Sequence, residues 1–110
     1  MASTRPQPGI LEEKLCAGFQ AAVELIGRRW SAAILVAISY GAERFGEIAK
    51  TVDGLSDRLL SQRLKELEQE GLITRTIVPT TPAYSRYSLS PRGRELMKVF
   101  RLLAEWAAKG

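Results

Sequence analysis

The apolar residues of this chain recur at helical spacing over most of its length. From Leu11 to Ile26 they predict one amphipathic helix, and Gly27 followed by Arg28-Arg29 is typical of a helix end. Ser31 to Tyr40 is nearly all apolar, which predicts a second helix buried on most of its sides and stopped by Gly41. The first 41 residues therefore predict two successive helices.

Two further helices are predicted before the period changes. Phe45 to Val52 has apolar residues on one face, and Asp53-Gly54 indicates a turn after it. Ser56 is a typical N-cap for a longer helix over Asp57 to Glu70, and Gly71 is typical of its C-terminal end. This is two helices joined by a tight turn.

A β-hairpin is predicted directly after the fourth helix. Leu72 to Val78 is rich in β-branched residues, Pro79 to Pro82 indicates a loop, and Ser85 to Leu89 predicts the returning strand. Ser90-Pro91 then opens a last helix, with Ser90 as N-cap and Pro91 at the first helical position. The fold class expected is therefore mainly α with a small β-hairpin, in the order of a winged helix-turn-helix with flanking N- and C-terminal helices.

The helix after the tight turn has two unlike faces when it is projected at ~100° per residue. Its leucines fall on one face, and the opposite face and its flanks are polar and basic. Arg and Gln can recognise guanine and adenine edges, whereas Ser and Lys can bind phosphates. A solvated face with local Lys–Glu pairs is the alternative, but the hairpin that follows favours DNA reading. The DNA contacts predicted on this side and its flanks are Asp57, Arg58, Leu59, Ser61, Gln62, Arg63 and Lys65.

The hairpin adds further candidates for contact with the DNA backbone. Arg75 and Arg86 lie on the two strands, and Thr80 and Thr81 lie in the loop between them. A basic wing of this kind can follow phosphates or enter a minor groove. The alternative is a surface hairpin that only covers the core.

Composition excludes most enzyme classes. The chain has 110 residues, which is enough for one domain, and a net charge of +4, which fits a polyanionic partner but is weak evidence by itself. It has no histidine, no glycine-rich nucleotide motif and one cysteine, so we expect no catalytic site, no metal and no cofactor. With no apolar segment of membrane-spanning length and no signal peptide, we expect a cytoplasmic protein. Residues 1–10 are expected to form a flexible arm and residues 11–110 the domain.

Several stretches resemble the HxlR-type winged helix-turn-helix transcriptional regulators. They are VELIGRRW at residues 23–30 and the run from Arg44 to Leu96, in which Arg44-Phe45, LSQRLKELE and SLSPRGREL are the most specific parts. The resemblance implies a homodimer, formed by the N- and C-terminal helices, on a pseudo-palindromic operator. It also implies that Arg44 approaches phosphate and that the DNA groove is contacted by Ser56, Arg58, Leu59, Ser61, Gln62 and Lys65. The sequence departs from the pattern of that family at two positions. Ala17 stands where family members usually have a proline, and Arg86 where an acidic residue is more common.

The resemblance gives Cys16 two interpretations, because several members of the family respond to oxidants or electrophiles through an N-terminal cysteine. Lys14, two residues earlier, and a helical turn beginning at Cys16 would both favour the reactive thiolate. The alternative is a small apolar residue packed at a dimer interface. Ala17 leaves both interpretations open.

The remaining apolar residues are assigned to packing. Trp30, Phe45 and Tyr87 are expected in the core, and a ligand pocket between the terminal helices is a minor alternative to a dimer seam. The expected dimer interface is Leu11, Leu15, Phe19, Phe100, Leu103 and Trp106. The function predicted is a sequence-specific regulator of transcription, most simply a repressor, that binds double-stranded DNA. The alternative is a winged-helix module that binds proteins, which an acidic or apolar reading face would have favoured.

Overall fold

A computed structural model of the chain describes residues 10–110, with side chains from residue 16 onward. Most of the predicted flexible arm lies outside the described residues. Ile10, which the prediction assigned to that arm, is instead the first helical residue. The elements in order are α1 (Ile10–Gly27), α2 (Ser31–Ser39), α3 (Phe45–Thr51), α4 (Asp57–Gln69), β1 (Ile73–Val78), β2 (Tyr84–Leu89) and α5 (Pro91–Lys109).

This order confirms the predicted winged helix-turn-helix, and the predicted element bounds agree with the structure to within one residue. Gly71 ends α4 in the left-handed conformation at φ 77°, which a glycine adopts without steric cost. α1 ends at Gly27, as predicted. The residue directly before α2, Trp30, adopts the left-handed conformation at φ 79°.

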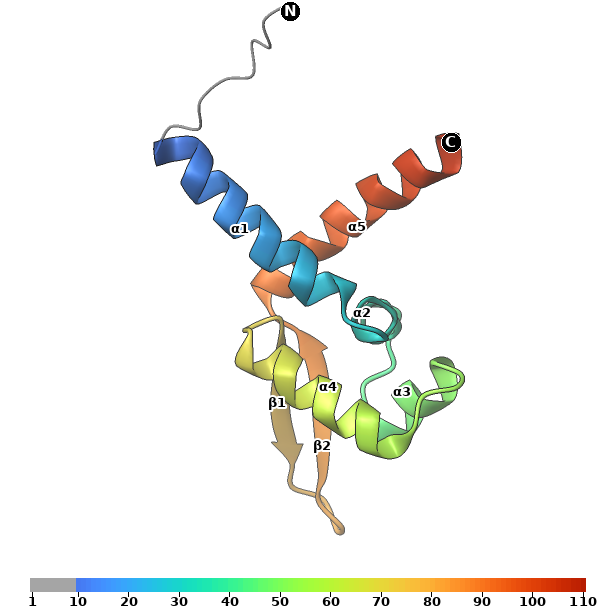
Figure 1. Ribbon diagram of the computed structural model, residues 1–110. Helices are drawn as coiled ribbons and strands as arrows, with labels where there is room; N and C mark the ends of the chain where they lie inside the picture. Colours follow the sequence, from blue (N-terminus) through green and yellow to red (C-terminus); the bar gives the residue numbers. More distant parts are fainter. Residues whose placement is uncertain (1–9) are drawn as a thin grey trace, which may run out of the picture.

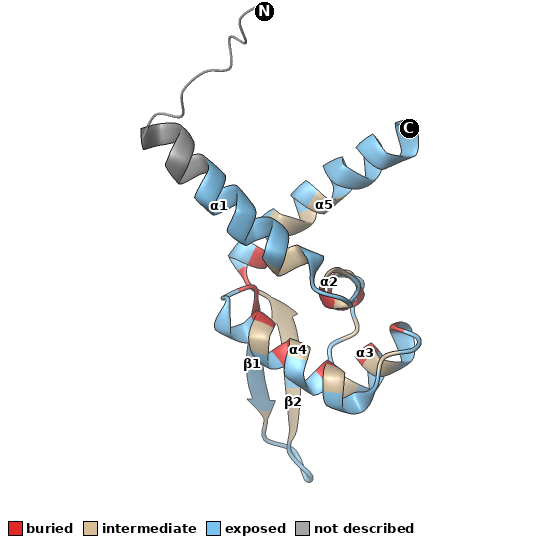
Figure 2. Ribbon diagram, in the orientation of Figure 1, coloured by how far each residue is buried: buried red, intermediate tan, exposed pale blue. Residues whose placement is uncertain are grey.

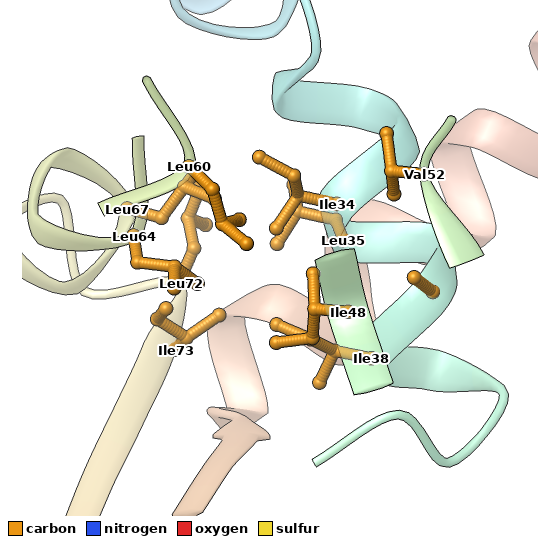
Figure 3. Close-up of a cluster of buried hydrophobic side chains, with 11 residues drawn as sticks. Ile34, Leu35, Ile38, Ile48, Val52, Leu60, Leu64, Leu67, Leu72 and Ile73 are labelled. Atoms are coloured by element: carbon orange, nitrogen blue, oxygen red, sulfur yellow. The ribbon is translucent and has the colours of Figure 1, made fainter. Parts of the chain in front are cut away.

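The core is formed where α2, α3 and α4 meet the start of β1. Leu60, Leu64 and Leu67 of α4 are buried, as their spacing predicted, and α2 contributes Ile34 and Leu35 from the other side (Figure 3). Burial of each such side chain stabilises the fold by about 1.5–3 kcal/mol. Trp30, Phe45 and Tyr87, which were expected in the core, are half-buried and pack against this cluster.

The hairpin pairs β1 with β2 in antiparallel register, with Ile73 opposite Leu89 and Val78 opposite Tyr84. Its outer edge is held by a backbone hydrogen bond of 2.8 Å, donated by the N–H of Tyr87 to the carbonyl oxygen of Glu43. The wing is therefore tied to the segment between α2 and α3 as well as to the end of α4.

The start of α5 is fixed tightly on the end of α4. The buried Ser90 caps α5 by accepting from the N–H of Gly93 at 3.0 Å, as predicted, and its Oγ donates to the carbonyl oxygen of Gly71 at 2.6 Å. Gly93 is buried against the backbone of Leu72, and a Cβ at this position would overlap the carbonyl oxygen of Leu72. Only a glycine allows α5 to approach so closely.

The N-terminal part of α1 and the C-terminal part of α5 extend away from the core of the domain. Figure 1 shows α1 and α5 diverging at the end opposite the loop between β1 and β2. Figure 2 shows that the described part of α1 and the C-terminal half of α5 are exposed along most of their length. None of the helices in the described part of the chain is long and apolar enough to cross a membrane.

Candidate nucleic-acid interface

The orientation of α4 is set by a cap at its start and by leucines along one side. Ser56 accepts a hydrogen bond from the N–H of Leu59 at 3.1 Å, so the first turn is satisfied and the helix begins where predicted. Because Leu60, Leu64 and Leu67 hold the opposite side in the core, the polar side of α4 must face outward.

The outward side of α4 carries most of the predicted DNA contacts. Leu59 is half-buried at its edge, and Gln62 donates a long hydrogen bond of 3.4 Å to Glu66 on the same helix. This side offers a guanidinium, an amide and hydroxyls within the first half of the helix, which is the half that usually enters a major groove, and an ammonium at Lys65 just beyond it. Its exposed members are Ser56, Asp57, Arg58, Ser61, Gln62 and Lys65.

Arg63 lies elsewhere, on the flank of α4 that faces the junction between α1 and α2. Its Nε donates to the carbonyl oxygen of Arg29 at 3.1 Å and its Nη1 to Glu66 at 3.0 Å. Its side chain is 16% exposed. The guanidinium is therefore committed within the chain, and the structure removes Arg63 from the surface that the other predicted contacts share.

Arg44 stands at the start of α3, beside the wing. Its guanidinium stacks on the ring of Tyr84 at 3.6 Å from the centroid, which joins α3 to β2. The carboxylate of Glu47 accepts from the backbone N–H groups of Arg44 at 3.0 Å and Glu43 at 2.9 Å. These two bonds, with that to Arg44 the larger effect, lower the pKa of Glu47. The carboxylate thus stays ionised and fixes the backbone from which Arg44 projects.

The two wing arginines point to opposite faces of the hairpin. Arg75 is paired with Tyr87 and Arg86 with Thr76, so alternation along the strands separates their side chains. Arg75 shares its face with Tyr87 and donates from Nε to Ser85 at 2.9 Å. Arg86 is exposed on the face that carries Tyr84 and hence Arg44.

In the wing loop, Thr80 and Thr81 are exposed as expected. The hydroxyl of Thr80 donates to the carbonyl oxygen of Pro82 at 2.9 Å. The loop thus presents short polar side chains without adding charge.

This arrangement matches a known family of regulators. The model of the HxlR-like helix-turn-helix family matches residues 25–110 of the chain. The chain belongs to this family. It is a DNA-binding regulator of transcription, as are the HxlR-like proteins to which it is similar.

Relatives of the HxlR-like family cover nearly the whole chain. The uncharacterized HTH-type transcriptional regulator YvaP of Bacillus subtilis is 38% identical over 98 residues, which are 89% of this chain and 91% of YvaP. The reduced transcriptional regulator YodB of B. subtilis has a TM-score of 0.75 at 38% identity, over 80% of this chain and 86% of YodB. Diamide-treated YodB gives a TM-score of 0.73 at 37% identity, over 82% of this chain and 89% of YodB. The redox regulator HypR in its oxidized form gives a TM-score of 0.75 at 26% identity, over 84% of this chain and 96% of HypR.

The HxlR-like domain carries its single cysteine on α1. Cys16 is exposed, and it is the seventh residue of a helix that begins at Ile10. The prediction that a helical turn starts at Cys16 is therefore wrong, and the favourable field of a helix N-terminus does not reach the thiol, because that field falls off within the first turn.

The predicted dimer residues divide into two groups. Phe19 is 67% exposed and Trp106 is 72% exposed, and Leu103 is also exposed, whereas Phe100 is half-buried against the chain's own core. The side chains of Leu11 and Leu15 lie outside the described residues. The exposed Val99 and Leu102, which the sequence prediction did not assign to the interface, extend the apolar surface of α5.

A groove of about 660 Å³ lies between α1, the end of α4 and α5. It is lined by both charged side chains, Arg28, Arg92 and Glu95 among them, and apolar ones. The groove lies between the terminal helices, where a ligand pocket was the minor alternative to a dimer interface. Its apolar lining residues include Ala21, Ala22, Leu25, Leu72, Leu96 and Val99.

Proposed function

We propose that this HxlR-like regulator binds a pseudo-palindromic operator as a homodimer, represses the genes beside it, and releases DNA when Cys16 is oxidised. The observation that carries the proposal is the polar side of α4, which is exposed opposite three buried leucines and begins at a capped helix N-terminus. A helix presented in this way has side chains for base edges and a favourable dipole for phosphate.

Arg44 and Arg86 support the proposal from the side of α4. Arg86 lies on the same face of the wing as Tyr84, the guanidinium of Arg44 stacks on the ring of Tyr84, and Thr80 and Thr81 lie in the wing loop. Phosphate contacts of this kind fix the register of a protein on DNA without reading sequence. We propose that α4 reads the bases and that this face of the wing follows the adjacent backbone.

The exposed apolar residues of α1 and α5 support a homodimer. Phe19 lies on α1, and Leu103 and Trp106 lie on the far part of α5, all in contact with solvent in one chain. Contiguous exposed apolar surface is costly and usually marks an interface. A two-fold mate would cover it and would place two α4 helices toward two half-sites one helical turn apart. We place this action in the cytoplasm, and a dimer bound beside a promoter represses most simply by blocking it.

Control through Cys16 rests on its exposure and on the relatives. The thiol is accessible on α1, close in sequence to Phe19, and YodB has been solved in reduced and diamide-treated forms. Diamide takes two electrons and two protons from two thiols and becomes the hydrazine, leaving one disulfide. With one cysteine in the chain, that bond joins Cys16 of two protomers or joins Cys16 to a small thiol.

The test is a titration of the purified protein against its own upstream intergenic DNA, with unrelated duplex as competitor, before and after diamide. The Cys16→Ser variant is the matched control. We expect tight, competitor-resistant binding that oxidation abolishes, reductant restores, and Cys16→Ser makes insensitive to diamide. Specific binding that ignores diamide overturns the role of Cys16. Absence of specific binding overturns operator recognition and favours a protein-interaction module.

A further inference from the structure

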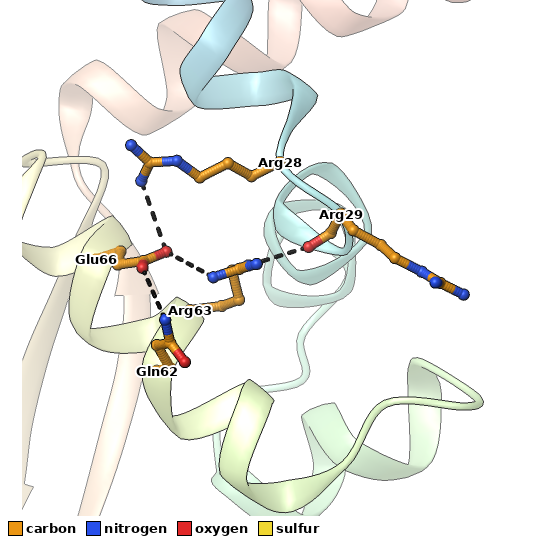
Figure 4. A network of polar contacts seen from close by, with 5 residues as sticks. All are labelled: Arg28, Arg29, Gln62, Arg63 and Glu66. Carbon is orange, nitrogen blue, oxygen red and sulfur yellow. Dashed lines mark hydrogen bonds and ion pairs between the residues drawn. The ribbon is translucent and has the colours of Figure 1, made fainter.

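A polar network joins the middle of α4 to the junction between α1 and α2 (Figure 4). Arg63 is at its centre, and bonds the carbonyl oxygen of Arg29 with Nε and the carboxylate of Glu66 with Nη1. The same carboxylate oxygen of Glu66 lies 3.5 Å from Nη1 of Arg28. Two segments 34 residues apart are thus connected by charged groups.

The side chains of this network are less exposed to solvent than those of a typical surface ion pair. The side chains of Arg63 and Glu66 are 16% and 27% exposed, and that of Arg28 is 42% exposed. Arg63 uses two nitrogens of its planar guanidinium on two different partners, which a lysine cannot reproduce. Its position is therefore set by geometry as well as by charge.

The junction that receives these bonds is short and has an unusual backbone. Three residues, Arg28 to Trp30, connect α1 to α2, and Trp30 is left-handed. The described part of α1 is exposed up to Glu24 and becomes half-buried at Leu25 and Ile26, so α1 meets the domain at this end. The direction in which α1 leaves the domain is consequently fixed at the residues that Arg63 and Glu66 hold.

We propose that Arg63 is a positioning residue, which with Glu66 pins α4 to the α1–α2 junction and couples the direction of α1 to the placement of the reading helix. Arg63 itself does not contact DNA. The proposal rests on the proposed role of α4 as the reading helix. It gives a physical route by which an event on α1 can change how α4 sits in a groove, since both share one clamped junction.

The experiment compares Arg63→Gln, Glu66→Gln and the double variant with Lys65→Gln, a neighbouring exposed cation on α4. The probe is a labelled duplex that the wild-type protein selects from a random pool, titrated at several salt concentrations. Folding is checked by circular dichroism. Amide hydrogen exchange of residues 28–34 reports on the junction, where Ser31 bonds Arg28 and Ile34 bonds Trp30 through the backbone.

We expect Arg63→Gln to weaken binding of the selected duplex roughly 2- to 30-fold, the range of coupling through packed networks. The salt dependence should stay unchanged, and exchange at residues 28–34 should accelerate. Glu66→Gln should do the same, and the double variant should lose no more than either single variant. Lys65→Gln should leave the exchange unchanged.

Several outcomes would overturn the proposal. A salt slope less steep by about one unit in Arg63→Gln would show a direct phosphate contact. Wild-type affinity together with wild-type exchange would show an idle network, and additive losses would show two independent sites. If Arg63→Gln does not fold, Arg63→Lys replaces it, and wild-type binding by that variant overturns the need for two separate nitrogens on a planar guanidinium.

Arg58→Ala separates this inference from the proposed function. If Arg58→Ala weakens binding while Arg63→Gln does not, the positioning role fails and α4 remains the reading helix. If neither changes the binding of the selected duplex, α4 is not the reading helix and the proposed interface fails with it.

Discussion

Arg58 is the best candidate on α4 for direct hydrogen bonds to the edge of a base. It is the second residue of the helix and is exposed, on the side opposite Leu60. A guanidinium at this position can donate two parallel hydrogen bonds to O6 and N7 of guanine.

Arg58→Ala should therefore weaken specific binding by ~1–3 kcal/mol and scarcely alter binding to unrelated DNA. Parallel titrations on the selected duplex and on a scrambled duplex measure the two effects. An equal loss on both duplexes would show that Arg58 contacts phosphate.

Arg75 and Arg86 lie on opposite faces of the hairpin, so we expect only one of them to contact the DNA backbone. Arg86→Ala should make the slope of log affinity against log salt less steep by about one unit, because one phosphate contact is lost. Arg75→Ala should leave the slope unchanged, since Arg75 lies on the face of Tyr87 and is held by Ser85. The reverse result would place the DNA backbone on the other face of the hairpin.

At the scale of elements, local signals were sufficient to predict the order and bounds of the fold. Ser56 and Ser90 cap helices where predicted, and the leucine spacing of α4 identified its buried side. Arg63 could not be placed in this way, because a helical projection gives an angle but not the neighbour 34 residues away that takes up the side chain. The facing of Arg75 and Arg86 likewise depends on strand register, which the residues of each strand alone do not set.

The close packing of α5 against the segment after α4 requires that residue 93 has no Cβ. Gly93→Ala should destabilise the protein by about 1–3 kcal/mol or more, because the added Cβ overlaps the carbonyl oxygen of Leu72. Gly46→Ala on α3 is the control, since a Cβ there meets no atom within 4 Å of it and alanine favours a helix. Urea unfolding of both variants measures the difference. Equal stabilities would mean that α5 can shift away without cost.

For the whole molecule, we propose that the exposed parts of α1 and α5 form the dimer interface. Trp106→Ala should raise the dissociation constant of the proposed dimer about tenfold or more, because large aromatic residues dominate interface energies. Lys98→Ala, which removes an exposed ion pair with Glu95 on the same helix, should leave it unchanged. Analytical ultracentrifugation at several protein concentrations measures the dimer dissociation constants of both variants. A wild-type monomer at micromolar concentration would contradict the prediction.

In the proposed dimer, the length of α5 between its packed start at Ser90 and Gly93 and its exposed apolar end would set the distance between the two copies of α4. One residue inserted after Phe100 would turn the distal surface by ~100° and advance it by ~1.5 Å, so the two copies would no longer match. Seven residues, close to two turns, would restore the facing and lengthen the arm by roughly 10 Å. Relatives that read differently spaced half-sites could thus evolve by whole turns of α5 while α4 and its reading face stay unchanged.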